Sequence, residues 1–165
     1  MILIGPEQPE DLAAIHAVVA QAFGQAAEAE LVDKLRDNSK AIVSLVAVEN
    51  AQIIGHILFS EVTIDATTII GLAPLAVLPS YQKQGVGTLL TNAGIAACRD
   101  AGYTAMVVLG HPHYYPRFGF VPASQFGIRS EYDVPDEVFM ALELQPGALA
   151  NCAGVAKYQV EFNEV

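Results

Sequence analysis

The segment from Ala73 to Thr88 constrains the fold of this chain more than any other stretch. An apolar run ends at Leu78, a turn broken by proline follows, and a loop with the pattern Gln-x-x-Gly-x-Gly occupies residues 82–87. Apolar residues at helical spacing begin directly after it. Glycine lets the backbone approach a bound group closely, and the amides at a helix start point their N–H groups toward an anion. The segment therefore predicts a strand, a turn and a helix whose first residues form a cradle for a phosphate.

The loop differs from two common phosphate-binding motifs. A P-loop requires Gly-Lys-Ser/Thr after four spacer residues, and that lysine is missing here. A dinucleotide-binding motif requires a third glycine where this chain has Leu90, followed by an acidic residue about 20 positions later. An ordinary strand–turn–helix joint, with glycines for close packing, remains an alternative for the loop taken alone.

A second segment, Val107 to Phe120, reads Val-Val-Leu-Gly-His-Pro-His-Tyr-Tyr-Pro-Arg-Phe-Gly-Phe and places Tyr115 four residues before a Gly-Phe pair. Together, the loop and this segment resemble the GCN5-related N-acetyltransferases (GNAT). The form of the second segment is similar to the bacterial YhbS-like branch of that superfamily. Residues 146–150 and 154–158 also resemble the tail of that branch.

The resemblance implies an α/β fold with a mixed, mainly antiparallel sheet, helices on both faces, and fourth and fifth strands that splay apart. It also implies transfer of an acetyl group from acetyl-coenzyme A to a primary amine by direct attack in a ternary complex. The acceptor would be a small-molecule or peptide amine. A non-catalytic module that binds or senses acyl-coenzyme A is the alternative, because the loop serves both functions equally.

The resemblance assigns a set of residues to acetyl-coenzyme A. The amides of the loop would hold the pyrophosphate, the strand before it would pair with the pantetheine arm, and the Val77 N–H could polarise the thioester carbonyl. The Gln82 side chain would brace the loop, and Lys83 is either a phosphate contact or a solvated surface lysine. The residues assigned in this way are Leu75, Ala76, Val77, Gln82, Lys83, Gln84, Gly85, Val86, Gly87 and Thr88.

Tyr115 is the candidate general acid, again by resemblance. A phenol with a pKa near 10 stays protonated at pH 7 and can donate to a thiolate whose conjugate acid has a pKa near 8.5. The alternatives are that Tyr115 only packs between sheet and helix, or that Tyr114 is the acid. Neither Cys98 nor Cys152 is expected to act as a nucleophile, so no acyl-enzyme is needed.

The general base is less constrained by the sequence. Glu61 could take the proton of the amine through water, or it could simply face solvent. His111 and His113 have a suitable pKa, but two ligands without a third are weak evidence for a metal. We expect loop structure or substrate contact for these histidines and no metal. Many family members place an Asn seven residues before the tyrosine, as a cofactor contact. This chain has Val108 there and departs from the family pattern at that position.

Composition bounds the partners and the compartment. The net charge is −10, from 18 acidic and 8 basic residues, and no cluster of basic residues suggests a nucleic-acid partner. An acidic surface attracts cationic amines, although net charge also serves solubility alone. No apolar run is long enough for a membrane span, no signal peptide is evident, and the cysteines show no metal or redox spacing, so a cytoplasmic location is expected. The chain could pair as a homodimer.

The 165 residues show no repeat and no linker, so residues 1–165 are expected to form a single N-acetyltransferase domain. Spacing on the first helix predicts Leu12, Ile15, Val19, Ala22 and Phe23 as its buried face. On the third helix it predicts Val86, Leu89, Leu90, Ala93 and Ala97. Helices are expected at residues 9–23, 27–38, 85–101 and, as a short turn, 114–118. Strands are expected at residues 42–49, 52–64, 68–78, 105–109, 138–144 and 155–162.

Overall fold

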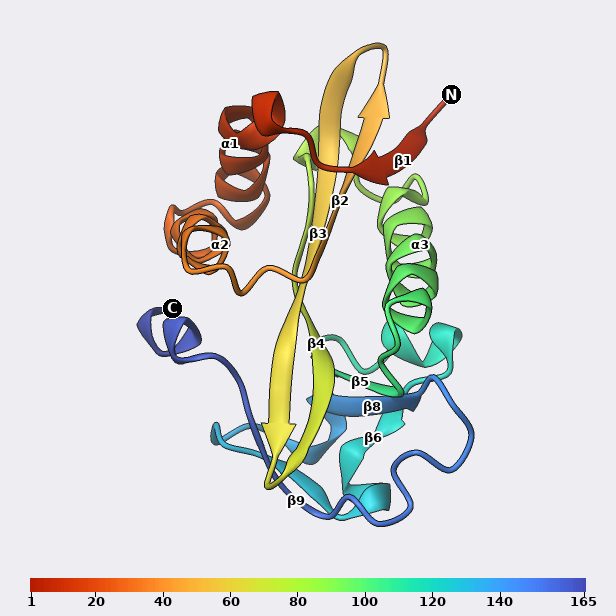
Figure 1. Cartoon of the computed structure of the whole chain (residues 1–165). Coiled ribbons are helices and arrows are strands. Elements are labelled where there is room, and N and C mark those ends of the chain that lie inside the picture. Colours follow the sequence, from red (N-terminus) through yellow and green to blue (C-terminus); the bar gives the residue numbers. More distant parts are fainter. The chain divides into compact units, whose positions relative to one another are not determined.

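The computed structural model describes all residues from Met1 to Val165, and these form two compact units (Figure 1). The first unit contains Met1–Phe59, Pro74–Ala97 and Val160–Val165. The second contains Ser60–Ala73 and Cys98–Gln159. The two longest strands, β3 (Gln52–Ile64) and β4 (Thr67–Val77), have residues in both units.

Three antiparallel strands build the sheet of the first unit, in the order β1-β2-β3. The edge strand β1 (Leu3–Pro6) pairs with β2 (Val43–Glu49), which pairs with the first part of β3. Asn50 and Ala51 join β2 to β3 with φ angles of 51° and 62°. Positive φ at both positions is typical of a two-residue hairpin turn.

Helices cover both faces of this sheet. In Figure 1, α1 (Leu12–Phe23) and α2 (Ala27–Asp37) lie on one side of β2 and β3, and α3 (Val86–Asp100) lies on the other. Close packing against α3 is possible because β3 carries Gly55, where an added Cβ would lie only 3.0 Å from Leu90 Cδ1.

The predicted buried faces of two helices need correction. On α1 the buried residues are Ile15, Val18 and Val19, whereas Leu12 and Phe23, at the helix ends, are exposed. On α3, Leu89 is exposed, and the buried positions are Val86, Leu90, Thr91, Gly94, Ile95 and Cys98. On α1 the predicted face was correct at its centre and wrong at the helix ends, and on α3 it was partly shifted, because helical spacing alone does not show where the neighbouring elements lie.

The second unit continues the sheet in the order β3-β4-β5-β8-β6, and β9 pairs with β3 and β7. Most pairs are antiparallel, but β4 is parallel to β5, as is β7 to β9. The bounds of the remaining strands are β5 Ala105–Leu109, β6 Val121–Pro122, β7 Ile128–Ser130, β8 Phe139–Glu143 and β9 Gly154–Lys157.

The parallel ladder between β4 and β5 is short. It joins Ile70–Leu72 to Met106–Val108, whereas β4 continues through Pro74 to Val77. Proline cannot donate a ladder hydrogen bond, which explains why pairing does not extend past it. The predicted α/β class is thus confirmed, with its mixed sheet, covered faces and splayed fourth and fifth strands.

Two parts of the chain differ from the sequence prediction. The short strands β1, β6 and β7 were not predicted, because two to four residues carry too little periodicity. The strand predicted for residues 155–162 ends at Lys157, and a 3₁₀ helix, Val160–Glu164, follows. That helix lies against α2, where Glu161 accepts hydrogen bonds from Asn38 and Lys40. No helix of this chain combines the length and the apolar character needed to cross a bilayer.

Candidate functional site

The loop between β4 and α3 is held by side-chain amides. A short 3₁₀ helix, Pro79–Tyr81, follows β4. The Gln82 amide donates to the Val77 carbonyl at 3.0 Å, and the Gln84 amide donates to the Ser80 carbonyl at 3.1 Å. Bracing by Gln82 was predicted and is confirmed, whereas bracing by Gln84 was not foreseen. Hydrogen bonds within the protein therefore fix the shape of the loop.

The backbone of this loop is suited to an anion. Gly85 has a φ of +85°, and a Cβ there would meet nothing within 4 Å. The Val86 side chain is buried, so only its backbone can contact a ligand. A helix that begins at Val86 leaves its first amides without intrahelical acceptors, and these favour a phosphate. The residues present thus fit a pyrophosphate.

The strand segment predicted for the pantetheine arm alternates in burial. Ala76 is buried, whereas Leu75 and Val77 are half-buried. Gln82 binds the Val77 carbonyl and not the Val77 N–H, so this hydrogen bond does not interfere with the role predicted for the N–H. The cofactor-binding roles of Leu75 to Val77, and those of Lys83, Gly87 and Thr88, stay predictions.

Tyr115 belongs to the second unit, at the start of the 3₁₀ helix Tyr115–Phe118. Its ring makes edge-on contacts with Tyr114 and Phe120, at centroid distances of 5.0 and 5.8 Å. It also lies on Gly110, where an added Cβ would be only 2.4 Å from Tyr115 Cε2. These contacts leave the residue 7% exposed and hold the ring in one orientation.

Burial determines the protonation of this phenol. It raises the pKa of Tyr115 above the usual range, with a smaller contribution from Tyr114. Burial acts on thiols in the same direction, since it raises the pKa of Cys98 to about 12. A buried phenol stays protonated at neutral pH, and a thiolate released into a buried site is a stronger proton acceptor than one in water. The high pKa of Cys98 also argues against a nucleophilic role for it.

Glu61, the predicted base, accepts a hydrogen bond at Oε2 from the Tyr103 hydroxyl at 2.6 Å. The bond orients the carboxylate, and the catalytic role of Glu61 stays a prediction. His111 and His113 are exposed, and the His111 carbonyl accepts from the N–H groups of Tyr114 and Tyr115. His111 thus has a part in loop structure. No three His, Cys, Asp or Glu side chains are grouped to hold a metal ion.

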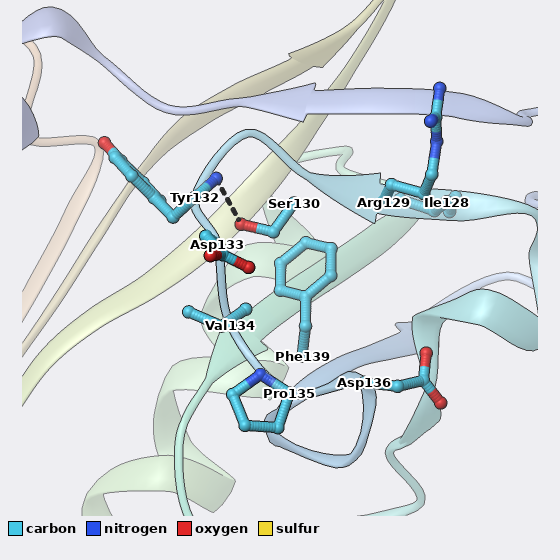
Figure 2. Close-up of a pocket in the computed structure, with 9 residues that line it drawn as sticks. All are labelled: Ile128, Arg129, Ser130, Tyr132, Asp133, Val134, Pro135, Asp136 and Phe139. Atoms are coloured by element: carbon cyan, nitrogen blue, oxygen red, sulfur yellow. Dashed lines mark hydrogen bonds between the residues drawn. The ribbon is translucent and has the colours of Figure 1, made fainter.

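Sequence reasoning missed a pocket of about 190 Å³ in the second unit (Figure 2). Residues of β7, of the following loop and of the start of β8 line it: Ile128, Arg129, Ser130, Tyr132, Asp133, Val134, Pro135, Asp136 and Phe139. The Ser130 hydroxyl accepts from the Tyr132 N–H at 3.0 Å and fixes the loop start. The available signal was the density of acids in residues 131–137, which has the sequence Glu-Tyr-Asp-Val-Pro-Asp-Glu.

Sequence reasoning also missed a polar chain in the first unit, in which His56 is buried and the other members are half-buried. The Arg36 guanidinium donates to both Glu7 oxygens at 2.8 and 2.9 Å. The Ser44 hydroxyl donates to a Glu7 carboxylate oxygen, so the Ser44 oxygen accepts from His56 Nε2, at 2.7 Å. The other ring nitrogen of His56, Nδ1, has no hydrogen-bond partner. Burial opposes ionisation of Glu7, but hydrogen bonds from His56, Arg36 and Ser44 hold its pKa well below the ordinary value. Burial lowers the pKa of His56, although Glu7 opposes this.

Comparison with known proteins places this geometry among acetyltransferases. The sequence profile of the Acetyltransferase (GNAT) family matches residues 11–120. The N-acetyltransferase YhbS of Escherichia coli K12 is 34% identical over 165 residues, which cover 98% of this chain and 99% of that protein. The crystal structure of Escherichia coli YhbS in complex with coenzyme A superposes with a TM-score of 0.94 and 34% identity, covering 98% of this chain and 92% of that one. A GNAT family acetyltransferase from Brucella melitensis, in complex with acetyl-coenzyme A, has a TM-score of 0.83 and 34% identity, with 98% of each chain covered.

Proposed function

The chain belongs to the acetyltransferase (GNAT) family and is an N-acetyltransferase that depends on acetyl-coenzyme A, and we propose that it transfers the acetyl group directly to a primary amine within a ternary complex. The observation that carries this proposal is the loop before α3. Its positive φ at Gly85, its open space and its helix start together fit a pyrophosphate.

The backbone would supply most of the cofactor contacts. Amides from Gln84 to Thr88 bind the pyrophosphate, and the exposed edge of Leu75 to Val77 pairs with the pantetheine arm. Side-chain braces from Gln82 and Gln84 support this assignment, because a preformed loop loses less entropy when it binds. The bound cofactor contributes a thioester, which activates the acetyl group toward an amine.

Tyr115 is proposed as the general acid. The neutral amine attacks the thioester carbonyl carbon, the new C–N bond forms and the C–S bond breaks. Tyr115 donates its phenolic proton to the departing sulfur, and the proton released by the amine returns to the phenol through solvent. The support is that burial keeps Tyr115 protonated and that Gly110, Tyr114 and Phe120 hold its ring.

Glu61 is proposed as the base that first accepts the proton of the amine through water and then releases it to solvent, from which the Tyr115 phenolate is reprotonated. Its support is limited to orientation of the carboxylate by Tyr103. Glu61→Gln would lower kcat if the carboxylate acts as a base, while Tyr103→Phe would have a small effect. Equal losses in the two variants would assign the pair a purely structural role.

Residues 1–165 are proposed to work as a single N-acetyltransferase domain. A cytoplasmic location is also proposed, since Cys98 and Cys152 are free thiols of the kind a reducing compartment preserves. The acceptor is proposed to be a small-molecule or peptide amine, and the net charge of −10 favours cationic ones. A homodimer remains a prediction that sedimentation velocity would test.

The direct test is a screen of amines with detection of free coenzyme A thiol. We expect thiol release from acetyl-coenzyme A that requires both the protein and an amine, and that Tyr115→Phe lowers by about 10²- to 10⁴-fold. If acetyl-coenzyme A binds but no amine releases thiol, the chain is a non-catalytic acyl-coenzyme A module.

A further inference from the structure

The pocket of the second unit has the size of a side-chain subsite. Its volume is about 190 Å³, smaller than the roughly 300–1,000 Å³ of sites for drug-sized ligands. It is lined by β7, by the start of β8 and by residues of the loop between them, and it is open to solvent. A short alkyl chain with one polar head fits this space, whereas a nucleotide does not.

The lining combines an apolar floor with an acidic rim. The Phe139 ring lies among the residues that line the pocket, with Val134 and Pro135 beside it (Figure 2). Asp133 and Asp136 contribute carboxylates, whereas the Arg129 side chain extends away from the Phe139 ring. An apolar wall with negative charge at its edge is complementary to an alkylammonium group.

The pocket also joins the segment that carries Tyr115. Phe139 lies opposite Leu109 in the β5–β8 ladder. The Gly110 N–H donates to the Val138 carbonyl at 2.8 Å, and the Tyr115 ring packs directly on Gly110. The pocket floor and the proposed acid are thus attached to the same backbone junction, at the carboxyl end of β5.

We infer that this pocket binds a second cationic group of the acceptor, distinct from the nitrogen that is acetylated. This rests on the proposed function. The attacking nitrogen must be neutral, and a carboxylate beside it would favour its protonated form. A rim with Asp133 and Asp136 is therefore unsuited to the nucleophile and suited to an ammonium elsewhere on the same molecule. The acceptor class is a diamine or polyamine, or another amine that carries a separate positive charge.

The test uses 1,5-diaminopentane and 1-aminopentane, which differ by one ammonium group. Diamine binding to the whole protein, with and without coenzyme A, is measured by calorimetry at 0.15 M salt. The variants are Asp133→Asn, Asp136→Asn and the double variant. Asp100→Asn, at the exposed end of α3, is the control for net charge. Exposed charge pairs are screened, so each single change should weaken diamine binding about fivefold and the double change about twentyfold.

Kinetics separate this inference from the proposed function. In the double variant, kcat/KM for the diamine should fall about twentyfold while kcat/KM for the monoamine stays the same. Unchanged diamine binding in the double variant, or an equal loss in Asp100→Asn, would overturn the inference and leave the acetyltransferase proposal intact. If no amine is acetylated, the proposed function fails, and the binding arm still decides whether the pocket holds an ammonium. Because Asp133 and Asp136 are exposed, either single variant suffices if the other is poorly folded.

Discussion

Gly110 should control the position of the proposed acid, and Gly110→Ala tests this. A Cβ at residue 110 would lie 2.4 Å from Cε2 and 3.0 Å from Cδ2 of Tyr115, whereas ordinary contacts begin at 3.4 Å. The ring must therefore retreat by about 1 Å. Tyr114 and Phe120 hold it edge-on, so it cannot move without disturbing its neighbours.

The expected loss follows from that displacement. Misplacing a catalytic group by about 1 Å can cost about 100-fold in rate, which corresponds to about 2.7 kcal/mol in the activation barrier. Overpacking should also lower the free energy of unfolding by about 1–3 kcal/mol. Affinity for acetyl-coenzyme A should change little, because the proposed pyrophosphate cradle is formed by other residues, 84–88.

The assay combines kcat with a double-mutant cycle. Gly5→Ala is the matched control, because a Cβ at residue 5 meets nothing within 4 Å and kcat should not change. In a Tyr115→Phe background, Gly110→Ala should lower kcat no further, since the displaced ring no longer carries a proton. A folded Gly110→Ala protein with full kcat would refute the reasoning. A full additional loss in the Tyr115→Phe background would show that the glycine acts through something other than the hydroxyl.

Other predictions concern the proposed cofactor loop and the polar chain of Arg36, Glu7, Ser44 and His56. Gly85→Val should weaken acetyl-coenzyme A binding at least about tenfold in calorimetry while the fold is retained, because left-handed backbone is unfavourable for a branched residue. Gly147→Val is the control for backbone strain alone, because Gly147 also has a positive φ, of +81°, and a Cβ there meets nothing within 4 Å. Pantetheine thioesters that lack the pyrophosphate should bind much more weakly than acetyl-coenzyme A. Equal affinities for the two ligands would refute the assignment of the loop to the pyrophosphate. Because the pKa of His56 is lowered in the folded state, the folded protein holds fewer protons on His56 than the unfolded chain. The free energy of unfolding should therefore be unaffected by His56 above its unfolded pKa of about 6.5 and should fall below that pH, by up to about 1.4 kcal/mol per pH unit. Urea unfolding of His56→Gln should lack this slope and keep the separate loss below about pH 4.5 that comes from the lowered pKa of Glu7.

Local patterns in the sequence predicted most elements of the fold. The β3 and β5 ranges, Gln52–Ile64 and Ala105–Leu109, match the expected strands, because long runs of branched residues carry a clear signal. A glycine shortly after a helical pattern is typical of a helix end, and Gly102, with a φ of +95°, follows α3 in this way. Helix faces were less predictable: Leu12, Phe23 and Leu89 are exposed because burial depends on the partner surface.

The candidate site divides in the same way. Gln82 could be assigned as a brace from the motif, because its contact to Val77 lies within five residues. The bond between Glu61 and Tyr103 joins residues 42 positions apart, and no local pattern indicated it. The contact of Gly110 with Tyr115 spans only five residues, but no motif indicated it, because it depends on the path of the loop between them.

The sequence by itself determined the family, the class of fold and the loop proposed to bind phosphate, because each depends on residue types at short spacing. Glycines at positions 85 and 87 and a helical pattern after them specify backbone geometry locally. Tertiary structure alone decided the burial that keeps Tyr115 protonated, the packing of its ring on Gly110, and the pocket around Phe139. These properties depend on the path of the loops and on which segments pack together and exclude water, and spacing along the chain carries no record of that.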